Sequence, residues 1–141
     1  MVTTIPSSPP GLAVEAMLQT RFRDATPFYA EMLTVFVSTS WEPLAGMRAA
    51  LDRGAWKDLG AGAHFVKGGA LSVGAELAAN EARALEEWAR AAQADGASRE
   101  TDGLAVRLDV LERTLRDIES FAARLTHWAR DARGGADEPA A

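Results

Sequence analysis

The chain has 141 residues, no cysteine and two histidines, and its 20 acidic and 15 basic residues give a net charge of -5. This length makes one ordinary domain, and the lack of cysteine excludes thiol catalysis, zinc-thiolate sites and disulfide scaffolds. The negative charge disfavours nucleic acid and anionic membranes as partners, and no apolar run is long enough for a membrane span or signal peptide, so we expect a cytoplasmic protein.

Both ends of the chain differ in composition from the middle. Residues 1–11 contain three prolines and several small polar residues, which predicts a flexible N-terminal arm. Residues 133–141 predict a flexible C-terminal tail in the same way. Between them, alanine is abundant and alternating Val/Ile runs are missing, so residues 12–132 are expected to form one all-helical domain.

The first half of this domain predicts two helices. A short one covers about residues 12–23, with apolar residues at helical spacing. The next begins at Thr26, a candidate N-cap that is followed by Pro27. We expect a kink or a restart at Pro43, which lacks an N–H group, and an end at Gly54.

The second half predicts three further helices. One covers about residues 55–71 and closes near Gly74, and another covers about 75–94. The last has the most regular spacing, with apolar residues at alternating steps of four and three: Leu104, Leu108, Leu111, Leu115, Ile118, Ala122, Leu125 and Ala129. This seam and the short connections predict an all-α fold, an up-down antiparallel four-helix bundle with a short extra N-terminal helix.

His64 lies in the predicted helix over residues 55–71, rotated away from its apolar stripe. The stripe consists of Leu59, Ala63, Val66, Ala70 and Val73. Helical spacing places Lys67 and Gly68 on the exposed face that carries His64, and Gly60 and Ala61 one turn earlier. The histidine is therefore expected to have one cation and several very small residues around it.

Such surroundings suit a phosphorylated histidine. Small residues let another protein approach the ring, and glycine inside a helix costs roughly 1 kcal/mol relative to alanine, which something should offset. Lys67 would place an ammonium beside an anion on the ring. Imidazole, with an ordinary pKa of about 6.5, can act as a nucleophile near neutral pH. By itself, however, a lone histidine on a helix is more often an ordinary boundary residue.

The wider segment resembles the signature of histidine-containing phosphotransfer (HPt) domains. In that family the acceptor histidine is followed by an apolar residue, Lys-Gly, small residues and an apolar-Gly pair. The corresponding residues here are Val66, Lys67-Gly68, Gly69-Ala70 and Val73-Gly74. Gly69 departs from the pattern, because serine or alanine is commoner there. The resemblance covers roughly residues 26–130, and residues 64–74 are its diagnostic part.

The resemblance implies a phosphocarrier without autonomous catalytic activity. His64 would accept a phosphoryl group from a receiver aspartate of a response regulator and return it to another receiver, in a relay that includes a hybrid sensor histidine kinase. Lys67 would offset the phosphate charge, and Gly68 would leave room for the receiver. No cofactor is expected in the chain, because the receiver brings the Mg²⁺. A monomer is expected.

Supporting residues follow from the same comparison. Gly74 would end the helix or permit a close crossing, and Glu86 would accept a hydrogen bond from Nδ1 of His64 or else be a solvated carboxylate. Arg90 could line the site, although surface arginines are usually solvated, and His127 is expected to pack within the last helix. Contacts with the partner are expected from Gly60, Ala61 and Leu71 near the acceptor, from Leu12 and Met17 of the first helix, and less certainly from Ile5.

Three other functions remain as alternatives. A helical adaptor could bind receivers or other signalling proteins without being phosphorylated. A sensor-kinase dimerisation domain would have an acidic residue after the histidine and a proline one turn later, whereas Phe65 follows His64 and no proline occurs there. An ordinary enzyme is least favoured, because no paired carboxylates, Ser/His/Asp set or phosphate-binding glycine loop can be identified.

Overall fold

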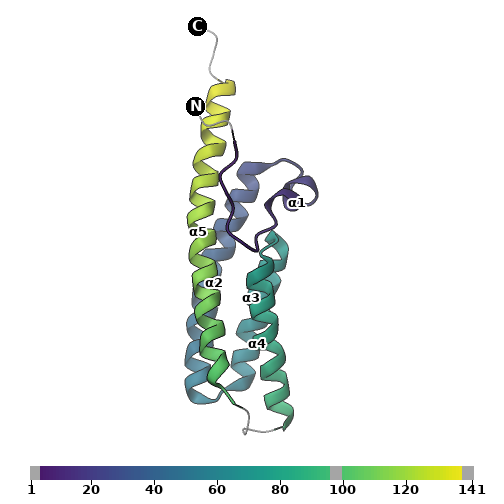
Figure 1. Ribbon diagram of the computed structural model, residues 1–141, viewed down its shortest axis with the longest axis vertical. Helices are drawn as coiled ribbons and strands as arrows, with labels where there is room; N and C mark the ends of the chain where they lie inside the picture. The colour runs from purple at the N-terminus through teal and green to yellow at the C-terminus, as the bar shows by residue number, and fades with distance from the viewer. Residues whose placement is uncertain (1–3, 96–99, 138–141) are drawn as a thin grey trace.

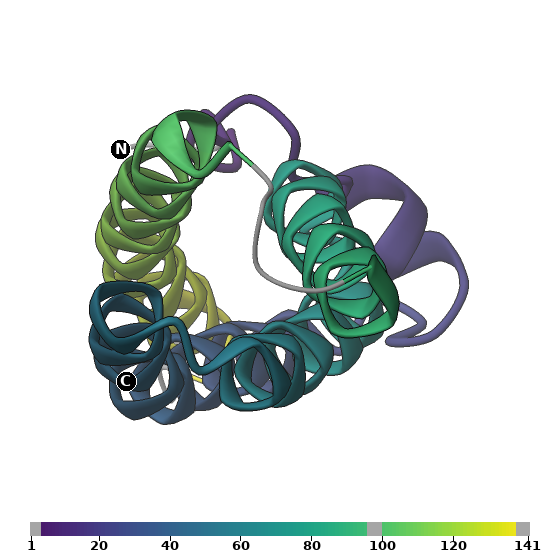
Figure 2. The same ribbon diagram turned by 90° about the horizontal axis from the view of Figure 1, so that it is seen from below.

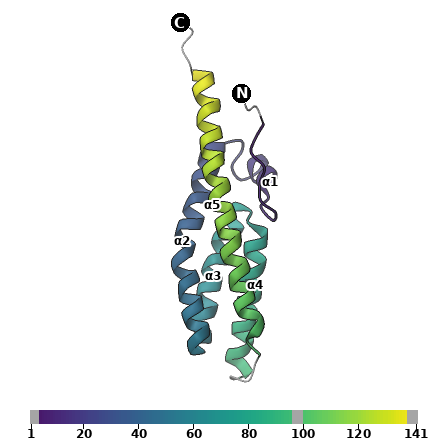
Figure 3. The same ribbon diagram turned by 60° about the vertical axis from the view of Figure 1, so that its left-hand side comes forward.

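The computed structural model describes residues 4–95 and 100–137, except for the side chains of residues 133–137. This part of the chain contains five helices, which are α1 (Val14–Gln19), α2 (Thr26–Arg53), α3 (Trp56–Val73), α4 (Glu76–Asp95) and α5 (Asp102–Asp137). The four long helices pack around a common axis (Figures 1 and 2), and α1 lies beside one end of the bundle (Figure 3). The predicted all-α bundle is confirmed.

The chain reverses sharply after α2 and after α3 because each helix ends at a left-handed glycine. Gly54 has φ of 68° and Gly74 has φ of 74°. In both turns the N–H after the glycine donates to the carbonyl five residues earlier, at 2.8 and 2.9 Å, which is a Schellman motif. Because of these two turns, α3 runs antiparallel to α2 and α4 runs antiparallel to α3, as the short connections predicted.

The core follows the predicted apolar patterns closely. Every residue of the seam between Leu104 and Ala129 is buried in α5, which packs against α2 and α4. In α3 the predicted stripe is buried as well, and α3 lies between α2 and α4. The opposite face of α3, which carries His64, is therefore left open to solvent.

Several helix boundaries differ from the prediction. α1 is shorter than the range 12–23, because Leu12 is in a bridge with Ala75 and the helix ends at Thr20, whose backbone is no longer helical. Positive φ angles at Arg23 and Asp24 then lead the chain into α2. The N-cap of α2 is Ala25, so the predicted capping role of Thr26 is wrong. The restart expected at Pro43 is also wrong. α2 continues through this proline, because buried side chains on both sides of it pack into the core and outweigh one lost hydrogen bond.

Parts of both predicted tails have regular backbone structure. At the end of the N-terminal segment, the carbonyl of Gly11 accepts a hydrogen bond from the N–H of Leu77 at 3.2 Å, and Leu12 forms an antiparallel bridge with Ala75. α5 extends to Asp137, past the predicted domain end at residue 132, and projects beyond the other helices (Figures 1 and 3). Residues 1–3 and 138–141 lie outside the described part.

The C-terminal end of α3 is held by three donors from earlier in the chain. Arg21 donates to the carbonyl of Ser72 at 3.1 Å, and the buried hydroxyl of Tyr29 donates to that of Val73 at 2.9 Å. The N–H of Ala13 donates to the carbonyl of Gly74 at 2.9 Å. These bonds satisfy carbonyls that a helix end leaves without intrahelical partners, and so they fix the helix that carries His64.

Within the described residues, no helix combines the length and the apolar character that crossing a membrane would require.

Candidate functional site

The site is centred on the imidazole of His64, which stands on the outer face of α3. Its side chain is 72 % exposed, and Nδ1 lies 2.6 Å from Oε2 of Glu86 on α4. An ionised carboxylate can only accept a hydrogen bond, so Nδ1 carries the hydrogen and donates it. In the neutral imidazole, Nε2 is then the ring nitrogen with a free lone pair.

Glu86 is held from two sides. Its second oxygen, Oε1, accepts a hydrogen bond from Nζ of Lys67 at 2.5 Å, and its side chain is only 10 % exposed. The hydrogen bond from Lys67 is the main cause that lowers the pKa of Glu86; burial opposes this effect, and the bond from His64 adds to it. The carboxylate is therefore ionised at neutral pH, and the reading of Glu86 as a solvated surface residue is wrong.

The side chain of Lys67 points in a different direction from the one predicted. It was expected to share the open face of His64, but its side chain is only 22 % exposed and reaches α4 to bind Glu86. In the described structure its charge thus acts on the carboxylate that holds the imidazole.

The small residues near His64 have separate roles. At Gly68 an added Cβ would meet nothing within 4 Å, and Ala61 is exposed, so both leave open space beside the ring. Gly60 does not: its Cβ would lie 3.3 Å from Cβ of Ala89 on α4. Gly60 is half-buried and allows α3 and α4 to approach closely, and its contact with the partner stays a prediction.

The other two glycines of α3 face α2. A Cβ at Gly62 would lie 2.7 Å from Cγ of Met47, and one at Gly69 would lie 2.9 Å from the ring of Phe36. The departure from the family pattern at Gly69 therefore has a packing cause, since the aromatic ring occupies the place of a side chain.

Other predicted residues divide into exposed and packed ones. Leu71 is 49 % exposed on the outer face of α3. Gly74 does both things expected of it, because it ends α3 and its Cβ would lie 2.6 Å from Cγ of Met17. The predicted place of Leu12 in a docking patch is wrong, because this side chain is buried. Met17 is half-buried and packs over Gly74. Ile5 is 40 % exposed.

The remaining polar candidates lie on α4 and α5. Arg90 is exposed one turn after Glu86, and no ion pair joins it to another described residue. His127 was expected to pack, but its side chain is 79 % exposed and Nε2 lies 3.3 Å from Asp131.

Phe65 is an exposed residue beside the acceptor to which the sequence reasoning gave no role. It directly follows His64 and is 56 % exposed. The family signature specifies nothing at this position. A signal was nevertheless present, because Phe65 falls outside the apolar stripe of its helix, where a large apolar side chain must meet solvent.

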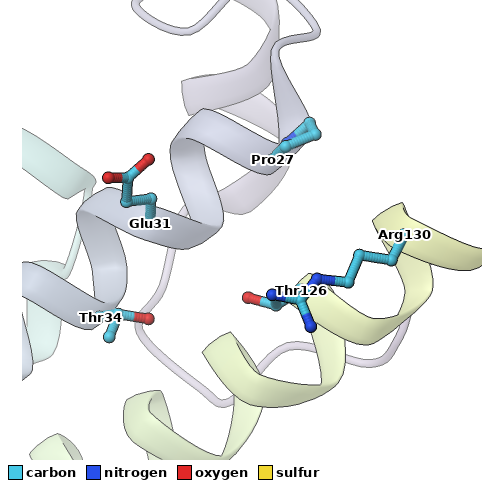
Figure 4. A pocket seen from close by; sticks show the side chains of 5 residues that line it. All are labelled: Pro27, Glu31, Thr34, Thr126 and Arg130. Atoms are coloured by element: carbon cyan, nitrogen blue, oxygen red, sulfur yellow. The ribbon is translucent and has the colours of Figure 1, made fainter. Parts of the chain in front are cut away.

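A separate groove of about 330 Å³ lies between the start of α2 and the end of α5 (Figure 4). The carboxylate of Glu31 points away from Arg130 across it, so the two charges do not converge on a ligand. None of its lining residues belongs to α3 or α4, which separates it from His64. Among the described residues, no group of three or more His, Cys, Asp or Glu is placed to hold a metal ion.

Two comparisons with known proteins find a match to this chain. The family model described as Hpt domain matches residues 31–121, a range that includes His64, Lys67 and Glu86. The chain is also similar to the crystal structure of histidine-containing phosphotransfer protein B (HptB) from Pseudomonas aeruginosa PAO1. The TM-score is 0.66 and the identity is 30 %, over 85 % of this chain and 97 % of that chain. A search of curated proteins finds no match.

Proposed function

This chain belongs to the Hpt domain family, and we propose that His64 is the residue through which it accepts and passes on a phosphoryl group. Histidine phosphotransfer in phosphorelay signalling is the function of the protein, and the family consists of phosphocarriers that interact with receiver domains and kinases. One observation carries the choice of residue: an exposed imidazole has its Nδ1 hydrogen bonded to the buried carboxylate of Glu86.

The geometry supports a direct displacement at phosphorus. Nε2 of His64 attacks the phosphorus of an aspartyl phosphate, the N–P bond forms, and the P–O bond to the aspartate breaks, leaving its electron pair on the departing carboxylate. Nδ1 keeps its hydrogen, so the ring becomes positively charged as the bond forms. Glu86 stabilises this charge because it is already ionised and already oriented toward Nδ1. Return of the group follows the reverse path.

Lys67 acts in this proposal mainly through Glu86. Its bond to Oε1 keeps the carboxylate ionised and in place, which in turn fixes the imidazole. Arg90, Ala61 and Leu71 are exposed near the acceptor or on its face and are proposed to contact the partner.

The Mg²⁺ that assists phosphoryl transfer is assigned to the receiver. Among the described residues, Glu86 is the carboxylate that contacts the ring of His64, and both its oxygens accept hydrogen bonds from donors of this chain. The bundle buries its core within one chain, which supports a monomeric carrier. We propose a cytoplasmic location, where a partner kinase has access to ATP.

The test is transfer from a phosphorylated receiver in buffer free of ATP. Wild-type protein should acquire an acid-labile, alkali-stable label, His64→Gln should acquire none, and His127→Gln should be labelled like wild type. Label that persists in His64→Gln would overturn the assignment of the acceptor. A wild-type protein that binds the receiver but takes no label would instead support the adaptor alternative.

A further inference from the structure

The helix that carries the acceptor also carries two large apolar side chains that are exposed to solvent. Phe65 and Leu71 are 56 % and 49 % exposed on α3, whereas no large hydrophobic side chain of α4 is comparably exposed. The surface of α4 beside the site instead carries Arg83, Glu87 and Arg90. The exposed surfaces of α3 and α4 therefore differ in chemistry.

The helix geometry places the bare position between the two apolar side chains. At about 100° per residue, Phe65 follows His64 toward the α2 side of the outer face, one turn before Gly69, which contacts Phe36 of α2. Leu71 lies about two turns beyond His64. Gly68 lies between them along the helix and leaves open space. Together these residues form an uncharged surface with a low centre.

A phosphoryl donor must cover part of this surface. In-line attack brings the reacting atoms to about 3–3.5 Å, and one helical turn is about 5.4 Å long. Any protein that presents an aspartyl phosphate to Nε2 therefore covers the residues within one turn of His64. The ring of Phe65, next in sequence and more than half exposed, falls inside that area.

We propose that Phe65 is a specificity-determining anchor, which the receiver domain buries against apolar side chains next to its phosphorylated aspartate. This inference rests on the proposed function, because the position of the partner follows from the reaction at His64. Large aromatic residues surrounded by a polar rim are the usual anchors of protein interfaces. A second copy of this chain fits less well, since two exposed side chains contribute far less than the roughly 800 Å² per partner of a stable interface.

The experiment compares Phe65→Ala with Val106→Ala, a control at a 61 % exposed apolar residue of α5. The dissociation constant for the receiver and the KM of transfer should rise about tenfold in Phe65→Ala, partly recover in Phe65→Leu, and stay unchanged in Val106→Ala. Potassium phosphoramidate, a small donor that needs no receiver, should label Phe65→Ala and wild type equally.

The remaining outcomes separate the two proposals. If phosphoramidate and receiver both fail to label wild-type protein, the proposed function fails. If wild type is labelled and Phe65→Ala binds the receiver as tightly as wild type, only the anchor is refuted. The anchor is also refuted if Phe65→Ala loses labelling by phosphoramidate, or if it abolishes a dimer of the wild-type chain while binding to the receiver is unchanged.

Discussion

Adding a side chain at Gly68 should make the protein more stable and, at the same time, slower in phosphotransfer. The residue lies inside α3, and an added Cβ would meet no atom within 4 Å. Glycine therefore lowers the stability of the helix at this position, and its lack of a side chain is not needed for packing. A partner that approaches His64 must pass over this position, because it lies one turn further along the same face.

The two effects can be estimated separately. Gly68→Ala should raise the free energy of unfolding by about 1 kcal/mol, the difference between the two residues in a helix interior. For a domain of this size, the midpoint of thermal unfolding should rise by about 4 °C. Gly68→Gln should be nearly as stable. However, displacing the receiver by about 1 Å should lower kcat/KM of transfer about 100-fold.

Gly46 supplies a matched control, because it also lies inside a helix with no atom within 4 Å of an added Cβ, but on α2. Stability is measured by urea unfolding, and transfer by stopped reactions with a labelled receiver. Gly46→Gln should be stabilised without loss of transfer. The reasoning is refuted if Gly68→Ala is less stable than wild type, or if Gly68→Gln transfers as fast as Gly46→Gln.

Three further predictions concern stability. The pKa of Glu86 is lowered from its ordinary 4.5, so its contribution to the free energy of unfolding is present above that pH and lost as the pH falls through the folded-state value. Wild type should therefore lose more stability on acidification than Glu86→Gln, and parallel pH profiles of urea unfolding would contradict this. Tyr29→Phe removes the buried bond to Val73 and should cost about 1–2 kcal/mol in urea unfolding, while an unchanged midpoint would show that the bond contributes nothing. Gly69→Ala should lower the thermal midpoint by overpacking against Phe36, at a cost of about 1–3 kcal/mol, and stabilisation like that of Gly68→Ala would speak against this contact.

The fold could be predicted because its patterns are local and redundant. The seam of α5 repeats over eight apolar positions, so single errors do not change the face that is buried. The glycines after α2 and α3 end their helices through backbone conformation alone, which a sequence shows directly. Pro43 misled the prediction because its cost is local, whereas the packing that outweighs it comes from the other helices.

The site was only partly predictable, because the type of a residue does not determine which way its side chain points in the folded protein. His64, Lys67 and Gly68 follow from their spacing on one helix. The ion pair between Lys67 and Glu86 depends on how α3 and α4 pack, which the spacing along one helix does not determine. The prediction for Leu12 was wrong for the same reason. The residue precedes α1, forms a bridge with Ala75 and is buried, although its sequence context predicted an exposed helix.

These observations also show why the acceptor needs the whole bundle. α3 contains four glycines, which together cost about 3–4 kcal/mol relative to alanine, so its helical form depends on packing against its neighbours. Three of the four provide that packing, since a Cβ at Gly60, Gly62 or Gly69 would press on α4 or α2. Close approach to α4 also brings Glu86 to His64. Three of the glycines that weaken the isolated helix are thus the residues that let its neighbours hold and orient the imidazole.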